Sequence, residues 1–301
     1  MNQSVMRICL LVGLTAPAWW AHADIELGRA AYQRGDYGVA MKELSAEAAR
    51  GNVRAQNYLG LMYEKGQGVA ANPSQALAWY RKAADKGFAP AQTSVGYFYE
   101  QGVAVARDPV QALSWYRKAA AQNFAQAQNN IGAFYETGRG VPVDPAQAAE
   151  WYKKAADQGH ASGLTNLGFL YARGKGVPQN DAMAVSLYRK AAEQNFPLAQ
   201  NNLGFMMAEG RGVAKDLAAA AEWYRRAADQ RFGLAQFNLS RLYEQGKGVP
   251  QDNAQALHWL TESANGGYKP AALRLVQVYT RGLLGQSPSP DMARQWSEKA
   301  R

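Results

Sequence analysis

The chain has 301 residues, 48% of them hydrophobic and 11% aromatic, and 33 basic against 24 acidic side chains give a formal net charge of +9. This apolar content excludes a largely disordered chain, because enough surface can be buried to offset the entropy of ordering. The only cysteine, Cys9, excludes an intrachain disulfide.

Residues 1–23 are predicted to form a cleavable secretory signal. Arg7 supplies the positive start, residues 8–20 the apolar stretch, and Ala21-His22-Ala23 a small-x-small cleavage site. An uncleaved membrane anchor is the alternative, but the apolar stretch is shorter than the roughly 20 residues that span a bilayer, and Pro17 interrupts it. We therefore expect a chain that starts at Asp24, has no transmembrane span after cleavage, and resides in the periplasm or is secreted.

Residues 24–52 are predicted to form a short helical hairpin. Small and apolar residues recur there at helical spacing, and Gly35-Asp36 is typical of a tight turn between two helices. The segment resembles a tetratricopeptide unit, since Gly35-Asp36-Tyr37 and Ala40 stand in the positions familiar from that family. We expect this hairpin to cap the N-terminal end of the segments that follow.

From Val53 onward, one 36-residue pattern recurs in six full copies. Self-similarity at a fixed period of this length is the signature of a stacked array. We predict six repeats over 53–268 and a truncated repeat over 269–301 that caps the C-terminal end. The full copies begin at Val53, Ala89, Ala125, Ala161, Pro197 and Gly233.

Each repeat is predicted to contain two helices, A and B. Helix A ends at a glycine, which adopts the left-handed conformation without a Cβ penalty: Gly66, Gly102, Gly138, Gly174, Gly210, Gly246 and Gly282. Helix B starts after an N-capping side chain: Asn72, Asp108, Asp144, Asn180, Asp216 and Asp252. Helix B ends near residues that tolerate positive φ, with Arg231 as the exception: Gly87, Asn123, Gly159, Asn195 and Gly267.

Two further features of the repeat predict its packing. Glycine inside helix A is costly unless two helices cross closely there, and it recurs at Gly60, Gly96, Gly132, Gly168 and Gly204. A tryptophan on helix B is expected to be the main adhesive between repeats. The tryptophans are Trp79, Trp115, Trp151, Trp223 and Trp259, with Leu187 in the one missing place.

Leu-Gly-x-x-Tyr, Gly-x-Gly-Val, Asp-Pro-x-x-Ala, Trp-Tyr-x-Lys-Ala-Ala and a closing Gly-Phe recur across residues 53–301. Together these motifs resemble Sel1-like repeats. The resemblance implies an all-α, right-handed superhelical solenoid whose inner face consists mainly of A helices and recruits other proteins. It also implies a role in the bacterial cell envelope, where many exported relatives work. Some exported relatives carry a cysteine pair in each repeat, and this chain has none.

No catalytic, cofactor or metal constellation is predicted. The Gly-x-Gly pairs lie between helices in each repeat, whereas a phosphate-binding loop follows a strand. His160 and His258 lack the spacing of a zinc site, and His160 takes the place of a phenylalanine that closes other repeats. A glycosidase needs two carboxylates about 5–10 Å apart, but the A-helix acids recur as scaffold residues do. These acids are Glu64, Glu100, Glu136 and Glu244.

Pairs of basic residues on helix B suggest an alternative function. One member of each pair is expected to be neutralised by an acid one turn later, as in Arg81–Asp85, Lys153–Asp157, Arg189–Glu193 and Arg225–Asp229. The other line of charges is either a solvated outer face or a track for an anionic polymer. The alternative is therefore an envelope protein that binds, or hydrolyses, an anionic glycan or peptidoglycan component. Nucleic acid is not expected as a partner.

Positions where the copies differ are expected to carry the function, because the scaffold does not demand them. One row follows the A-helix glycine: Leu61, Tyr97, Ala133, Phe169, Phe205 and Arg241. A second row lies one helical turn earlier: Asn57, Thr93, Asn129, Thr165, Asn201 and Phe237. On a concave surface, aromatic anchors beside amides suit an extended peptide.

The leading prediction is therefore a non-catalytic scaffold of the cell envelope that needs no cofactor. It would bind a protein or extended peptide in a concave groove. The alternative, that Phe169 and Phe205 pack between neighbouring A helices, stays open at the level of sequence.

Overall fold

The computed structural model describes residues 18–300, with side chains from residue 25 onward. Most of the predicted signal sequence, residues 1–17, lies outside this range. The part of the chain that the structure describes forms sixteen α-helices and no β-strand, which confirms the all-helical prediction. None of these helices is long and apolar enough to cross a membrane.

The chain divides into two compact units, which meet in sequence at Ala127 and Gln128. The first unit contains α1 (Ala18–Arg34), α2 (Tyr37–Ala49), α3 (Val53–Lys65), α4 (Pro73–Asp85), α5 (Ala89–Gln101) and α6 (Pro109–Ala120). The division falls inside α7 (Ala125–Thr137). The second unit continues with α8 (Pro145–Asp157), α9 (Ala161–Arg173), α10 (Asp181–Ala192), α11 (Pro197–Glu209), α12 (Leu217–Asp229), α13 (Gly233–Gln245), α14 (Asn253–Asn265), α15 (Lys269–Arg281) and α16 (Pro290–Lys299).

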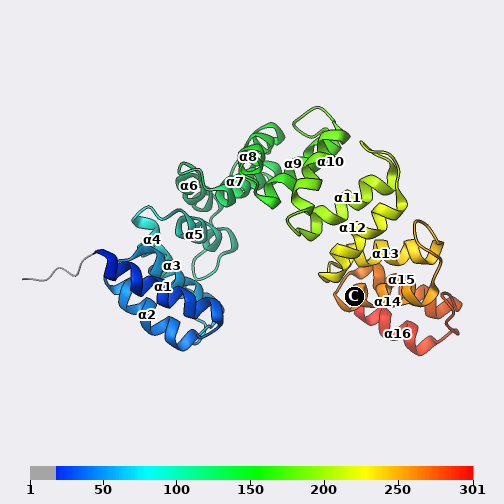
Figure 1. Cartoon of the computed structure of the whole chain (residues 1–301), viewed down its shortest axis with the longest axis horizontal. Coiled ribbons are helices and arrows are strands. Elements are labelled where there is room, and N and C mark those ends of the chain that lie inside the picture. The colour runs from blue at the N-terminus through cyan, green and yellow to red at the C-terminus, as the bar shows by residue number, and fades with distance from the viewer. Residues whose placement is uncertain (1–17, 301) are drawn as a thin grey trace, which may run out of the picture. The chain divides into compact units, whose positions relative to one another are not determined.

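The helices form a solenoid of hairpins in which neighbours in sequence are neighbours in space. From α1 to α6 in the first unit, and from α8 to α16 in the second, each helix packs against the next (Figure 1). From α3 onward the odd-numbered helices are the predicted A helices and the even-numbered ones the B helices. Any surface built from A helices alone therefore combines residues about 36 positions apart.

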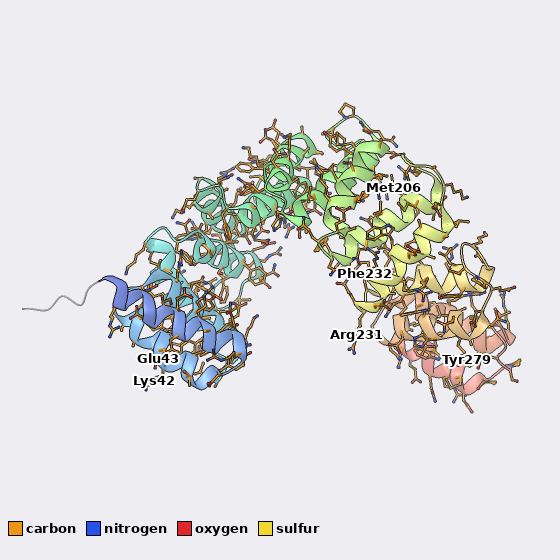
Figure 2. All side chains as sticks on the ribbon, in the orientation of Figure 1. Lys42, Glu43, Met206, Arg231, Phe232 and Tyr279 are labelled. Carbon is orange, nitrogen blue, oxygen red and sulfur yellow. The ribbon has the colours of Figure 1, made fainter. Side chains whose placement is uncertain are left out.

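The predicted helix ends are confirmed. Every glycine that closes helix A is left-handed, with φ between 62° and 73°. All six predicted caps accept a backbone N–H at the start of helix B. Residues after helix B have positive φ, and they include Arg231 at 62°, where a side chain with a Cβ is strained. Figure 2 labels Arg231 and Phe232 where α12 leads into α13.

Tyrosine, rather than tryptophan, lies at the centre of five of the six full repeats. The residue after the tryptophan position is 0–4% exposed in five repeats: Tyr80, Tyr116, Tyr152, Tyr188 and Tyr224. The tryptophans are only partly buried, and Trp79 packs on the core that α1, α2 and α3 form. Successive residues of a helix point about 100° apart, so only one of two adjacent aromatic rings can face helix A. The tyrosine therefore packs between the two helices of its own repeat, whereas Trp79 and Trp115 pack on helices of the preceding repeat, as expected of residues that join repeats.

In four of the five repeats with this tryptophan, a cation from the same helix covers the indole. A basic side chain three residues after the tryptophan lies over the ring, at 3.7–4.5 Å from its centroid. A cation over an indole face is attracted by the ring quadrupole. These contacts join Lys82 to Trp79, Lys118 to Trp115, Lys154 to Trp151 and Arg226 to Trp223.

The glycine inside helix A is required by the buried tyrosine, which confirms the predicted close crossing. A Cβ at Gly132 would lie 2.6 Å from the ring of Tyr152, and the same holds at 2.5–3.0 Å in the other four repeats with this glycine. In repeat 233–268 both positions change together, to Ser240 and Leu260. The smaller leucine leaves room for a side chain on helix A, so the two positions act as a pair.

Buried glutamines join successive repeats, and the sequence pattern did not reveal this role. Gln200 in α11 is fully buried, and its Nε2 donates to the Ala192 carbonyl at the end of α10 at 3.2 Å. Its Oε1 accepts from Nε2 of Gln230, after α12, at 2.8 Å. Gln92 makes the matching bonds with Ala84 and Gln122 in the first unit. One side chain thus holds three helices of two repeats together.

We predict that Gly132→Ala lowers stability, although alanine is the better helix former. Alanine should add about 1 kcal/mol of helix propensity, but overpacking against Tyr152 should cost about 1–3 kcal/mol. We expect a net loss of up to roughly 2 kcal/mol, measured by urea unfolding followed with circular dichroism.

Two controls decide the cause of this loss. Gly38→Ala in α2 adds a Cβ with no atom within 4 Å, so it should be neutral or stabilising. Tyr152→Leu in the Gly132→Ala background should recover part of the stability, as the natural pair of Ser240 and Leu260 suggests. Equal effects of Gly132→Ala in the tyrosine and leucine backgrounds would contradict the pairing.

Candidate functional site

The row of variable aromatic residues is exposed to solvent. Phe169 on α9 and Phe205 on α11, both in the second unit, are 39% and 44% exposed. In the first unit, Tyr97 on α5 is 46% exposed. Each follows the glycine that faces the buried tyrosine, so it points about 100° away from the core. The two phenylalanines are therefore surface residues rather than packing residues between A helices.

The remaining members of this row and one member of the second row differ in exposure. Leu61, Ala133 and Phe237 are half-buried, and Arg241 on α13 is exposed. Phe237 packs against Tyr268, with 5.5 Å between their ring centroids. The guanidinium of Arg173 lies over the exposed Phe169 ring, 5.4 Å from its centroid.

The second row does not supply the open amide donors that we expected. Thr93, Asn129, Thr165 and Asn201 are at most 8% exposed. The hydroxyls of Thr93 and Thr165 donate to carbonyls of their own helices. The row is buried because it lies where successive A helices meet.

The asparagines of this row are used inside the scaffold. Asn129 Oδ1 accepts from Asn166 at 3.0 Å, and Asn201 Oδ1 accepts from Asn238 at 2.9 Å. The half-buried Asn57 has an Oδ1 atom without a hydrogen-bond partner among the described residues. These residues order the A helices, and only their aromatic neighbours remain available to a partner.

Two hollows adjoin the exposed row in the second unit. One, of about 240 Å³, is lined by Phe205 and Ala208 of α11, Tyr224 of α12 and Arg241 of α13. The other, of about 450 Å³, lies between α13 and α15 and is also lined by Arg241. The two hollows and Phe205 make this part of the second unit a candidate binding surface.

The glutamates at the ends of A helices are structural acceptors. The hydroxyls of Tyr80, Tyr116 and Tyr152 donate to Glu64, Glu100 and Glu136 at 2.6–2.7 Å. Burial, together with this bond to a carboxylate, raises the pKa of Tyr80 and of Tyr152. Glu244 pairs instead with Arg274 of the next repeat. These bonds give each acid a scaffold role in place of the paired catalytic geometry of a glycosidase.

The predicted neutralisation of the basic pairs occurs once. Lys153 and Asp157 form an ion pair at 2.6 Å, but the other three predicted pairs do not form. Arg81 donates to the Tyr99 hydroxyl of the next repeat at 2.6 Å, and Arg225 donates likewise to Tyr243. The arginines reach a phenol hydroxyl across the repeat boundary rather than a solvated acid on their own helix. Binding of an anionic glycan stays a prediction.

Each Gly-x-Gly loop joins helix A to helix B of one repeat, and its second glycine contacts the preceding repeat. A Cβ at Gly176 would lie 2.1 Å from the Pro145 carbonyl oxygen, and one at Gly248 would lie 2.2 Å from the Leu217 carbonyl oxygen. The absence of a Cβ at the second glycine of the motif therefore lets the loop lie directly on the first turn of the preceding B helix. This contact explains the motif without a bound phosphate.

His160, which takes the place of a phenylalanine in other repeats, caps a helix. Its Nδ1 accepts the Gly163 N–H at 3.2 Å, at the start of α9. His258 is exposed beside the Trp259 ring. Across residues 18–300, no three histidine, cysteine or acidic side chains are grouped so that they could hold a metal ion.

The Sel1 repeat model matches seven segments of the sequence, over residues 53–88, 89–124, 125–160, 161–196, 197–232, 233–268 and 270–301. The chain belongs to the Sel1-repeat family. Proteins of this family are generally protein-interaction scaffolds and non-catalytic. None of the curated proteins matches this Sel1-repeat chain.

Solved structures agree with the family and the fold. A protective antigen of uropathogenic Escherichia coli with an SLR fold is 35% identical, with a TM-score of 0.71 over 93% of this chain and 61% of that one. A Sel1 repeat protein from Oxalobacter formigenes is 32% identical, with a TM-score of 0.58 over 92% of this chain and 96% of that one.

A more distant structure shows the fold alone. An immunity protein from Pseudomonas aeruginosa is 22% identical, with a TM-score of 0.50 over 70% of this chain and 80% of that one. The Sel1-repeat chain thus spans most of its structural relatives, but only 61% of the Escherichia coli antigen structure.

We predict that His160 makes stability depend on pH. Burial lowers the pKa of His160 below its ordinary value of 6.5, so the folded chain holds the neutral imidazole that accepts from Gly163. The contribution of His160 to the free energy of unfolding should be fully present above pH 6.5. It should fall as the pH drops below that value, because the unfolded chain then binds an additional proton.

The matched variant is His160→Asn, since Asn52 caps α3 at the same repeat position. Urea midpoints of the two proteins, measured between pH 7.5 and pH 5, should converge or cross as the pH falls. A constant difference across this range would show that His160 does not titrate on unfolding.

Proposed function

We propose that this Sel1-repeat chain is a non-catalytic scaffold that binds a protein segment on the A-helix surface of its second unit. The observation that carries the proposal is the exposure of Phe169 and Phe205 on successive A helices, with Phe205 beside the hollow at Ala208. Apolar rings left in water on a rigid scaffold lower the free energy when a partner buries them. Exposed aromatic anchors are also common centres of protein interfaces.

The arrangement of this surface favours a polypeptide segment. Phe169 and Phe205 occupy the same position in adjacent repeats, so a partner segment that follows the A helices can place a side chain against each ring. Arg241 continues the row on α13 with a positive charge. The segment that we propose therefore has apolar residues for the two rings and an acidic residue toward α13.

We further propose that the chain works in the cell envelope. The support is the N-terminal sequence, with Arg7, an apolar stretch and Ala21-His22-Ala23. When the full chain is expressed in a bacterium, we expect the protein in the periplasmic fraction to begin at Asp24, as determined by N-terminal sequencing. Replacing Ala21 and Ala23 by arginine should leave residues 1–23 attached. An uncut chain in the cytoplasmic fraction would contradict export.

The binding proposal predicts that two substitutions abolish partner recovery. Full-length protein would be cross-linked in cells, purified, and its cross-linked peptides identified by mass spectrometry. Phe169→Ala/Phe205→Ala should reduce cross-links to the partner at least tenfold, because a buried aromatic anchor contributes more than about 1.4 kcal/mol. In the unaltered protein, the peptides of this chain that are cross-linked to the partner should map to α9, α11 and α13.

The control changes two exposed apolar residues outside the row. Val143 and Met183 are 60% and 42% exposed, in the loop before α8 and at the start of α10. Val143→Ala/Met183→Ala should leave the cross-links unchanged. Equal loss in both double variants, or no loss in either, would refute the proposed surface.

A further inference from the structure

Four of the six full repeats carry a glutamate at one equivalent position near the end of helix A, and repeat 197–232 does not. In the first three repeats the buried tyrosine donates to a glutamate 16 residues earlier, as Tyr152 does to Glu136 at 2.7 Å. In repeat 197–232 the tyrosine is Tyr224, and the residue 16 positions earlier is Ala208. At Tyr224, the glutamate that accepts from the tyrosine hydroxyl in other repeats is therefore replaced by the methyl group of Ala208.

Repeat 161–196 has the same replacement, Ala172, but there Arg211 from the loop of the next repeat reaches this position. Arg211 donates to the Ala172 carbonyl at 2.9 Å and to Oδ1 of Asp181 at 2.7 Å. This ion pair lies beside Tyr188, whose pKa is raised to about 12, mainly by burial. The missing glutamate is thus compensated by residues of the chain.

Repeat 197–232 has lost this compensation as well. Leu217 stands at the position of Asp181, and Lys247 at that of Arg211. The result is the hollow of about 240 Å³ between α11, α12 and α13, which Ala208, Tyr224 and Lys247 line. No described residue makes a hydrogen bond with the Tyr224 hydroxyl, which distinguishes it from Tyr80, Tyr116 and Tyr152.

The charge around the hollow favours an anion. Three cationic side chains line it, Lys215, Arg241 and Lys247, against one acidic side chain, Glu209. None of the four forms an ion pair within the described part of the chain. A carboxylate entering the hollow would gain a hydrogen bond from Tyr224 and attraction to cations that have no other partner.

From this geometry we propose that the hollow binds the side-chain carboxylate of a glutamate from a partner polypeptide. The proposal rests on the scaffold function proposed above and names the residue that the partner inserts. Glutamate is favoured because the chain's own Glu64, Glu100 and Glu136 occupy the matching position against the same phenol. Phe205 at the edge of the hollow would cover an apolar neighbour of that glutamate.

The test uses three small probes on the full-length protein, followed by two-dimensional NMR. N-acetyl-glutamate amide carries one side-chain carboxylate, N-acetyl-glutamine amide carries none, and N-acetyl-glutamine carries only a terminal one. The first probe should give saturable shifts centred on Tyr224 and Arg241, whereas the second should give none. Tyr224→Phe should weaken binding of the first probe about tenfold, because only the hydroxyl donor is removed.

Ala208→Glu is the decisive variant. It introduces the chain's own carboxylate at the position where three other repeats carry it, so the protein should fold normally and stop binding the first probe. Thr280→Glu is the matched control, since it adds the same charge at the equivalent position of the last repeat. Binding should be unchanged in this control.

Equal shifts from the first two probes, or shifts that persist in Ala208→Glu, would overturn the proposal. Binding of N-acetyl-glutamine in place of the glutamate amide would also overturn it, since the hollow would then fit a chain terminus. These probes contain no partner sequence, so their result is separate from the cross-linking of Phe169 and Phe205. Cross-links lost in the phenylalanine variant but kept in Ala208→Glu would refute the glutamate assignment and leave the scaffold function intact.

Discussion

The close contact between a glycine of helix A and a tyrosine of helix B determines the rest of the repeat. With no Cβ at Gly132, the Tyr152 ring lies flat against the helix and is 1% exposed. A phenol buried this deeply needs a partner for its hydroxyl. Glu136, at the end of helix A, provides that partner. In the first three full repeats, the small residue thus makes room for a large ring, and an acid accepts a hydrogen bond from the hydroxyl of that ring.

Features set by local geometry could be predicted from sequence. The closing glycines, the N-caps such as Asp144 and the helical period depend on residues within a few positions, so one copy of the repeat was sufficient. Which of two adjacent rings faces the core could not be decided in this way. Trp151 and Tyr152 are both large aromatic residues at the same period, and only the helix that crosses them distinguishes one from the other.

The candidate site was predicted in part. Phe169 and Phe205 were selected because the copies differ there, and the structure exposes both. The amide row was misjudged, because Asn129 and Asn201 hydrogen-bond the next A helix, a contact invisible within one repeat. The position of Ala208 was missed for another reason. An alanine in a helix carries no chemical signal by itself, and its meaning depends on the glutamates in the equivalent places.

The glutamine bonds between repeats have a consequence for how such a chain changes in evolution. Gln200 bonds Ala192 of the preceding repeat and Gln230 of its own repeat, and where Leu164 replaces this glutamine, Gln194 reaches the Gly159 carbonyl of the preceding repeat at 2.9 Å instead. Gene duplication or deletion of a whole repeat therefore joins ends that already fit, whereas losing a few residues disrupts the junction with the preceding repeat. The length of the molecule can change in steps of one repeat, and a binding surface can be lengthened to suit a longer partner without redesign of the interior.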